Sequence, residues 1–317
     1  MSDDIVKKKV SIMIPVYNEE EALPFLYERL VSLIDFQISY EWEILFVNDG
    51  STDRTLSLLL QMHLKDPRIN VIDLSRNYGK EIAMLAGFDY VTGDCMINLD
   101  ADLQDPPELI PEMLEYWEQG YDDVYAKRRT REGESWMKRL TAHVFYLILQ
   151  KTTNIKLQRD TGDFRLLDKN CIEALRLIRE SQRYTKGLFS WIGFKKKEIL
   201  FDRPSRIAGS TKWNYWKLIG LAMEGLTSFT ISPLRISSIL GILVSLGSFV
   251  YMCWVFGKAI LYGDPVQGYP SLMVVLLFLG GVQLLSLGIL GESVGRIFYE
   301  TKQRPLYFVR GYNGQKL

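Results

Sequence analysis

Two aspartates close together, Asp100 and Asp102, are the side chains in this sequence best suited to chemistry. They follow the apolar run Cys95–Leu99, which predicts a short buried strand, and they precede Pro106 and Pro107, which stop it. Alternation along a strand would point both carboxylates in one direction, where they repel each other. A hard divalent cation, Mg²⁺ or Mn²⁺, removes this repulsion and can also hold phosphate oxygens. The competing interpretation is a pair of solvated turn aspartates beside the start of a helix.

Strand-type runs alternate with helical patterns along the first part of the chain. Strands are predicted at 10–15, 42–47, 69–74, 95–99 and 122–126, and a helical pattern separates each strand from the next. This alternation indicates an α/β domain, with a mostly parallel sheet covered by helices on both faces. In such sheets, ligands bind at the carboxyl ends of the strands.

Polar side chains gather at four of the predicted strand ends. These clusters are Tyr17–Glu19, Asn48–Asp49, Ser75–Asn77 and Asp100–Asp102. Turn chemistry explains Gly50 and Ser51, but it does not require an acid at each of three strand ends. The same segments predict helix caps, with Asn18 and Glu21 at the first helix and Ser51 or Thr52 at the second.

Several functional classes are disfavoured by what the sequence lacks. No Gly-x-Gly-x-x-Gly follows the first strand and no Gly-x-x-x-x-Gly-Lys occurs, which disfavours dinucleotide-type and P-loop sites. The 38 basic and 38 acidic residues balance, so no global field selects nucleic acid as a partner. Three scattered cysteines indicate a reducing compartment, and two histidines make histidine-based metal or triad chemistry improbable.

Two uncharged runs, 236–257 and 269–290, are each long enough to cross a bilayer. The short connection 258–268 makes them a two-helix transmembrane hairpin, and the alternative is a buried core hairpin in a soluble protein. Basic residues concentrate outside the hairpin, which predicts a multi-pass protein of the inner (plasma) membrane with both termini cytoplasmic. The polar N-terminus is not a signal peptide. Residues 214–229 suit an amphipathic helix at the membrane surface, or equally a helix that caps a domain.

These features predict four regions. They are a cytoplasmic catalytic domain (1–213), an amphipathic juxtamembrane helix (214–232), two transmembrane helices (233–295) and a basic cytoplasmic tail (296–317). Within the first region, basic residues gather at 127–139 and in the loop 203–213, where a solvated charged loop is the competing explanation.

The motifs together resemble those of the inverting family 2 glycosyltransferases. They are PVYNEE from Pro15, NDGSTD from Asn48, RNYGK from Arg76 and DADLQDPP from Asp100. The resemblance is closest to the polyprenyl-phosphate branch, which comprises bactoprenol glucosyltransferases and dolichol-phosphate mannose synthases. It continues through GDFR from Gly162, RIAGSTKW from Arg206 and the two-span C-terminus, and it implies a GT-A-type nucleotide-sugar-binding fold.

The resemblance also implies roles for particular residues. The residues implied to bind the nucleotide-sugar donor are Pro15, Tyr17, Glu19, Asp49, Lys80, Asp100, Arg206, Ser210 and Lys212. The residues implied to bind the divalent ion, Mg²⁺ or Mn²⁺, are Asp100, Asp102 and Gln104. The residues implied to bind the acceptor phosphate are Arg128, Arg131, Ser135 and Arg139. Asp102 and Asp163 are the implied catalytic residues, and Asp163 acts either as the base or as a group that orients the acceptor.

The implied reaction moves a hexose from a nucleotide sugar to the phosphate of a polyprenyl phosphate, such as undecaprenyl phosphate, with inversion. Glucose from UDP-glucose is the expected donor, while mannose from GDP-mannose or a modified aminosugar stays open. One rival is a processive polysaccharide synthase, which would bring more spans and a Gln-x-x-Arg-Trp motif. A transporter subunit and a non-catalytic nucleotide-sugar-binding protein are the others. A lone hairpin anchor is compatible with a homo-oligomer.

Overall fold

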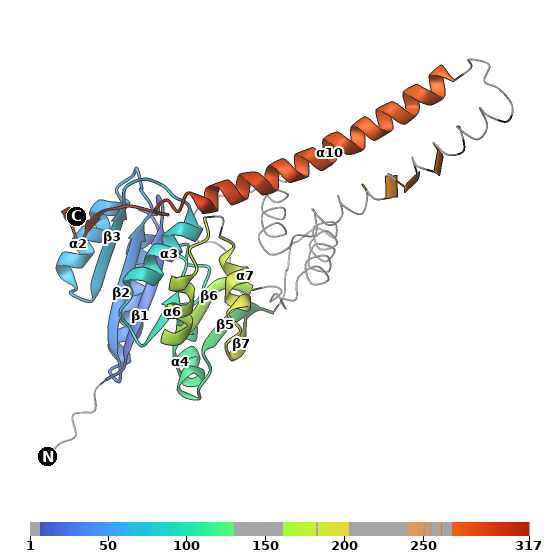
Figure 1. Ribbon diagram of the computed structural model, residues 1–317. Coiled ribbons are helices and arrows are strands. Elements are labelled where there is room, and N and C mark those ends of the chain that lie inside the picture. The colour runs from blue at the N-terminus through green and yellow to red at the C-terminus, as the bar shows by residue number, and fades with distance from the viewer. Residues whose placement is uncertain are drawn as a thin grey trace. The chain divides into compact units, whose positions relative to one another are not determined.

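A computed structural model describes residues 7–129, 161–181, 183–202 and 268–316, together with isolated positions between 241 and 261. The chain divides into two compact units, Met1–Ala222 with Pro305–Leu317, and Met223–Arg304. The first unit holds the sheet, and the second contains helix α10 (Tyr269–Thr301) (Figure 1). Each unit is described by itself below.

The first unit is built on one nine-stranded sheet, in the order β7–β5–β6–β4–β1–β2–β3–β8–β9. The central strands β4, β1, β2 and β3 run parallel, and antiparallel pairing begins at β6 on one side and at β8 on the other. The predicted α/β fold with its parallel strands is confirmed. The strands are β1 (Lys9–Val16), β2 (Glu41–Asn48), β3 (Ile69–Leu74), β4 (Cys95–Asn98), β5 (Asp123–Arg128), β6 (Thr161–Asp168), β7 (Lys196–Phe201), β8 (Val309–Tyr312) and β9 (Gln315–Lys316).

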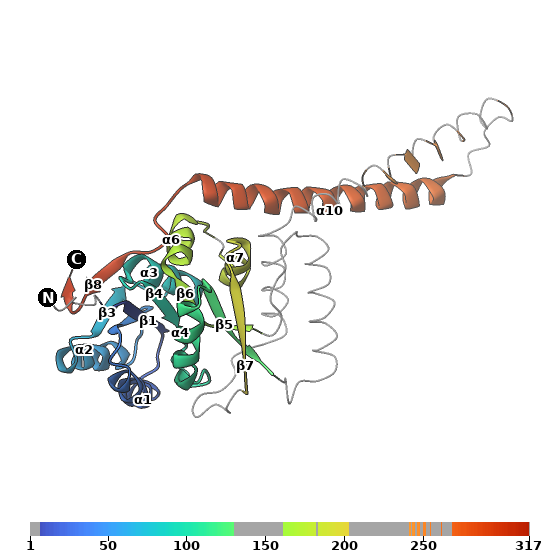
Figure 2. The same cartoon turned by 90° about the horizontal axis from the view of Figure 1, so that it is seen from below.

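Helices cover both faces of this sheet. Figure 2 shows α3 (Lys80–Tyr90) and α6 (Lys169–Leu177) on one face and α1 (Leu23–Phe36), α2 (Thr55–Lys65) and α4 (Ile110–Glu118) on the other. The alternation of strand side chains explains the two layers. Ile12 and Ile14 join the core under α1 and α4. Met13 points to the opposite face, where a Cβ on Gly87 of α3 would lie 2.5 Å from its Cγ.

The first helix starts later than its sequence predicts. Helix α1 begins at Leu23 after Ala22, and no side chain caps it, so the predicted cap at Asn18 is wrong. Asn18 instead has a φ of 54°, and its Oδ1 accepts a hydrogen bond from the Thr52 backbone N–H at 2.8 Å. Its own N–H donates to Ser51 Oγ at 3.0 Å. These bonds join the end of β1 to the end of β2, and this use of the side chain competes with capping.

The second helix likewise lacks the predicted cap. Neither Ser51 nor Thr52 caps α2, because the helix begins only at Thr55. The N-cap position is Arg54, and no side chain caps the helix. In the turn before it, the Thr55 backbone N–H donates to Asp53 Oδ1 at 3.0 Å.

The segment predicted as a tail returns to the sheet. Strand β8 pairs antiparallel with β3, and β9 pairs with β8. Arg310 of β8 donates from Nε and Nη2 to the two carboxylate oxygens of Asp73, at 2.7 and 3.0 Å. Asp73 Oδ1 also accepts from Asn48 Nδ2 at 2.8 Å, at the carboxyl end of β2. Residues beyond α10 therefore help to hold the strand end that carries the NDGSTD motif.

In the second unit, α10 carries the apolar character expected of a membrane span. Among the described residues, one helical segment, Phe278–Thr301, is long and apolar enough to cross a membrane, with a mean hydropathy of 1.3. The predicted helix at 214–229 lies outside the described residues, and so does most of the predicted span at 236–257.

Candidate active site at the carboxyl ends of the strands

Asp49, at the end of β2, fixes the loop that leads into α3. Its two oxygens accept hydrogen bonds from the backbone N–H groups of Tyr78, at 2.7 Å, and Gly79, at 2.9 Å. Burial raises the pKa of Asp49, and the two N–H groups oppose that rise. The carboxylate predicted to bind the donor thus also shapes the RNYGK loop.

Gly50 lets the same two segments approach each other closely. Its φ of +65° is a conformation that favours glycine, and a Cβ at this position would lie 2.4 Å from the Arg76 carbonyl carbon. The NDGSTD turn and the RNYGK loop therefore come within van der Waals contact of each other because residue 50 has no side chain. Nearby, Tyr17 leaves 43% of its surface exposed, so its ring is accessible to a ligand.

Lys80 lies at the centre of the candidate site. Its Nζ is 2.6 Å from Asp100 Oδ1 and 2.6 Å from Asp163 Oδ2, so it bridges the ends of β4 and β6. Desolvation would lower the pKa of the Lys80 ammonium, but the charges of Asp100 and Asp163 outweigh it and raise that pKa. The side chain is still 41% exposed, which leaves room for a ligand beside it.

Asp163 is held in place from both its backbone and its side chain. Its backbone carbonyl accepts from Asn98 Nδ2 at 2.8 Å, and its Oδ1 is 3.9 Å from Lys186 Nζ. Burial would raise the pKa of Asp163, but Lys80 and then Lys186 hold that pKa well below its usual range. The predicted catalytic carboxylate is therefore ionised and lies between two lysines.

Asn98 and Lys186 are residues that sequence reasoning missed. Asn98 carried a usable signal, because a fully buried amide inside the apolar run CMINL needs a hydrogen-bonding partner. Lys186 carried none, since a lysine near the start of a short helix is ordinary in any surface segment.

The predicted metal ligands follow β4 directly. The strand ends at Asn98, so strand alternation does not determine how Asp100 and Asp102 point. Asp102 Oδ1 accepts from the Gln104 backbone N–H at 3.1 Å, and Leu103 between them has a φ of 59°. Gln104 Oε1 is buried and has no hydrogen-bond partner among the described residues.

These three side chains suit a hard divalent ion. Two carboxylates and an amide oxygen are the donor types that Mg²⁺ and Mn²⁺ prefer, and such ions keep further positions for water and phosphate. The described residues contain no group of three or more His, Cys, Asp or Glu side chains placed to hold a metal.

The remaining predicted residues divide between the described and the undescribed parts of the chain. Pro15 lies within β1, Glu19 donates its backbone N–H to Thr55 Oγ1 at 2.9 Å, and Arg128 ends β5. The predicted acceptor residues Arg131, Ser135 and Arg139 lie outside the described residues. So do the predicted donor residues Arg206, Ser210 and Lys212.

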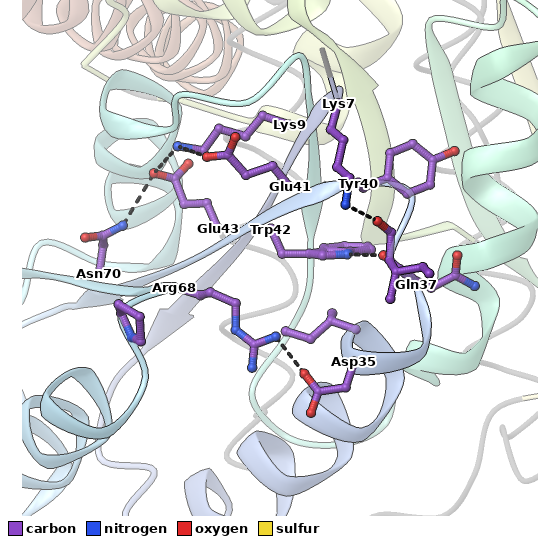
Figure 3. A pocket seen from close by; sticks show the side chains of 13 residues that line it. Lys7, Lys9, Asp35, Gln37, Tyr40, Glu41, Trp42, Glu43, Arg68 and Asn70 are labelled. Carbon is purple, nitrogen blue, oxygen red and sulfur yellow. Dashed lines mark hydrogen bonds and ion pairs between the residues drawn. The ribbon is translucent and has the colours of Figure 1, made fainter. Parts of the chain in front are cut away.

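A separate cavity of about 470 Å³ lies at the opposite, amino ends of the strands (Figure 3). Most of its charged side chains pair with one another, as Arg68 does with Asp35 at 2.7 Å and Lys9 with Glu43 at 3.8 Å. None of the predicted site residues lines it, so we place the candidate site at the carboxyl ends.

Comparison with known proteins finds relatives along almost the whole chain. The model of the family described as glycosyl transferase family 2 matches residues 11–176, and that of the GtrB C-terminal hairpin matches 232–297. An uncharacterized glycosyltransferase from Synechocystis is 48% identical, covering 95% of this chain and 94% of the relative. A prophage bactoprenol glucosyl transferase homolog from Escherichia coli is 44% identical, covering 95% and 98%. The bactoprenol glucosyl transferase of Shigella phage SfX is 44% identical, covering 95% and 99%.

Proposed function

The chain belongs to glycosyl transferase family 2, and we propose that it transfers glucose from UDP-glucose to the phosphate of a membrane-borne polyprenyl phosphate, such as undecaprenyl phosphate. One observation carries the choice of acceptor. The similarity to relatives named bactoprenol glucosyl transferase spans both the catalytic region and the hairpin, 95% of the chain in all. A glycosyltransferase with a soluble acceptor has no need of that second part.

The reaction is a single displacement at the anomeric carbon. An oxygen of the acceptor phosphate forms a bond to this carbon while the bond to the nucleoside diphosphate breaks, and the electron pair leaves with the diphosphate. A phosphate monoester has a second pKa of about 6, so at neutral pH the acceptor is already mostly dianionic. The attacking oxygen therefore needs no strong base.

The low pKa of Asp163 supports an orienting role for this residue. A carboxylate stabilised by Lys80 and Lys186 is a poor proton acceptor, since general bases work best with a pKa near the operating pH. We assign Asp163 to holding the two lysines and thereby the acceptor, and Lys80 to the donor side, where it contacts Asp100.

The departing diphosphate carries negative charge that must be stabilised. A divalent ion bound by Asp100, Asp102 and Gln104 would supply Lewis-acid stabilisation of this charge. The bound ion would also neutralise the repulsion between the aspartates, and Lys80 offsets part of it without the ion.

The hairpin brings the catalytic unit to its acceptor. Each prenyl CH₂ buried in the bilayer contributes about 0.8 kcal/mol, so the long lipid does not leave the membrane readily. An enzyme anchored in the same membrane meets the lipid phosphate at the surface. Placement in the inner membrane with a cytoplasmic catalytic unit follows from this function.

A panel of radiolabelled nucleotide sugars tests the proposal. We expect label from UDP-glucose, rather than GDP-mannose or UDP-N-acetylglucosamine, to enter an organic-extractable lipid when undecaprenyl phosphate and Mg²⁺ or Mn²⁺ are present. Chelation of the metal should abolish the transfer. Faster transfer to a water-soluble alcohol than to prenyl phosphate would contradict the acceptor assignment.

A further inference from the structure

Lys186 is a second lysine beside Asp163, and it comes from an element that none of the glycosyltransferase motifs contains. It lies in the short helix α7 (Thr185–Trp191). We infer that Lys186 binds the phosphate of the lipid acceptor, an assignment that rests on the proposed function. It names a binding residue for the group that attacks the sugar, and this residue is nearest to the Asp163 oxygen that Lys80 does not contact.

Helix α7 is hydrogen-bonded to α3 at the end that carries Lys186. The Thr185 backbone N–H donates to Glu81 Oε2 of α3 at 2.9 Å. Burial raises the pKa of Glu81, and the bond from Thr185 opposes this rise. Glu81 follows Lys80 directly in α3. One residue of this helix is therefore the first lysine at Asp163, and the next residue holds the start of the helix that carries the second lysine, Lys186.

The other end of α7 is fixed by an aromatic contact. The guanidinium carbon of Arg165 lies 3.8 Å from the centre of the Phe189 ring, and Arg165 itself pairs with Asp123 at 3.0 Å. Arg165 is two residues from Asp163 on β6, so both side chains are on the same face of the strand. The helix that carries Lys186 is thus packed against the strand that carries Asp163.

The two lysines differ in how closely they pair with carboxylates. Lys80 lies 2.6 Å from two carboxylates, which together neutralise it. Lys186 lies 3.9 Å from a single carboxylate oxygen, too far for a hydrogen bond, and its side chain is 39% exposed. Its ammonium therefore keeps donors for an incoming anion.

A phosphate dianion at this place needs such a cation. Asp100, Asp102 and Asp163 all lie at this end of the sheet, and an acceptor that approaches Asp163 without compensation would be repelled. Lys186 lies on the Oδ1 side of Asp163, away from the oxygen that Lys80 contacts. A phosphate that binds Lys186 therefore does not have to take over the contacts that Lys80 makes with Asp100 and Asp163.

Steady-state kinetics of Lys186 variants of the full chain test the assignment. We expect Lys186→Ala to raise the KM for undecaprenyl phosphate about tenfold to a hundredfold, as is typical for the loss of a charged hydrogen bond. The KM for UDP-glucose should stay within about twofold, since that binding step is separate. Lys186→Arg should recover most of the acceptor affinity. Lys65→Ala, at the exposed end of α2, is the matched lysine control.

The outcomes separate the two proposals. If the unaltered protein transfers glucose to prenyl phosphate and Lys186→Ala leaves the acceptor KM unchanged, the role of Lys186 is wrong while the function stands. Equal rises in the KM values of donor and acceptor would also overturn it, because they would mean that Lys186 only supports Asp163. If the unaltered protein makes no glucolipid, the proposed function itself fails. Lys186→Gln, which keeps most of the side chain, replaces Lys186→Ala should that variant not fold.

Discussion

At the residue scale, the candidate site depends on a balance between acids and lysines. Lys80 contacts Asp100 and Asp163 at 2.6 Å each, and Lys186 approaches the second oxygen of Asp163. This arrangement keeps Asp163 ionised, and it ties the end of β4 to the end of β6. The site therefore combines a group that orients cations with a pair of aspartates suited to a metal.

The first prediction concerns Asp163 and pH. Because the pKa of Asp163 is lowered in the folded protein, this carboxylate is ionised throughout the range from about pH 5 upward and cannot produce an acidic limb near pH 6. The limb should come from the acceptor phosphate, whose second pKa is about 6. We expect Asp163→Asn to lower kcat/KM for the acceptor about tenfold to a hundredfold and to leave the limb in place.

The pH profile of kcat/KM for the acceptor, from pH 5 to 9, measures the acidic limb in the unaltered protein and in Asp163→Asn. If the acidic limb disappears in Asp163→Asn, the residue is a base after all. If turnover stays near that of the unaltered protein, Asp163 has neither role.

The second prediction concerns Asp102 and the metal. Removing one of two carboxylates weakens a hard-cation site, so Asp102→Ala should raise the Mn²⁺ concentration needed for half-maximal activity and lower kcat about a hundredfold or more. Titration of activity with Mn²⁺ measures both effects. Glu112→Ala, an exposed acid on α4, is the control. An Asp102→Ala enzyme with undiminished activity and metal response would remove Asp102 from the site.

At the element scale, short loops between strands and helices decide the shape of the site. The NDGSTD turn, the RNYGK loop and the start of α3 are joined by Asp49, whose oxygens accept from Tyr78 and Gly79. The same turn receives a connection from the far end of the chain, because Arg310 of β8 holds Asp73 and Asp73 holds Asn48. The predicted donor side of the site is thus assembled from three strand ends.

The third prediction tests the close approach at Gly50. An alanine there would be strained by φ and would also clash with the Arg76 backbone, whereas Gly120, with a φ of +82°, has nothing within 4 Å of an added Cβ. Gly120→Ala should therefore show only the backbone strain of about 1–3 kcal/mol, and Gly50→Ala should lose more stability and raise the KM for UDP-glucose. Thermal unfolding and donor kinetics of the two variants measure the difference. Equal losses in both would show that the contact with Arg76 is unimportant.

At the scale of the whole molecule, the sheet constrains how often the chain crosses the membrane. Strand β8 pairs with β3, so residues before and after the second unit belong to one folded sheet. A single crossing by α10 would place them on opposite sides. A membrane span by α10 would therefore require a second crossing between residues 222 and 305, as in the two-span hairpin that the sequence predicts.

The fourth prediction follows from this constraint. In intact cells, a membrane-impermeant maleimide added from outside should label a cysteine introduced by Asp264→Cys, in the connection between the spans. A cysteine introduced by Lys316→Cys, on β9, should react only after the membrane is permeabilised. The positive-inside pattern independently requires the same result. Labelling at position 316 in intact cells would contradict the cytoplasmic placement of β8 and β9, and labelling at both positions would also contradict the hairpin.

The sequence by itself determined the alternation of strands and helices, the position of the polar clusters at the strand ends and the apolar run in α10. These features depend on side-chain periodicity and on turn residues, which act between neighbours in the chain. The two predicted caps failed for a related reason. Asn18 and Ser51 bond to each other across two strand ends, and no local pattern shows which distant partner a polar side chain will find.

Only the tertiary structure decided which residues meet. Lys80 and Asp163 are 83 positions apart, and the Val71 backbone N–H donates a hydrogen bond to Asn313 Oδ1, 242 positions away. Such contacts exist because particular strands pair, and the pairing is set by burial of the whole sheet rather than by any local segment. For that reason Lys186 and the return of β8 to the sheet came from the fold, whereas Asp100 and Asp102 were recognisable from the sequence alone.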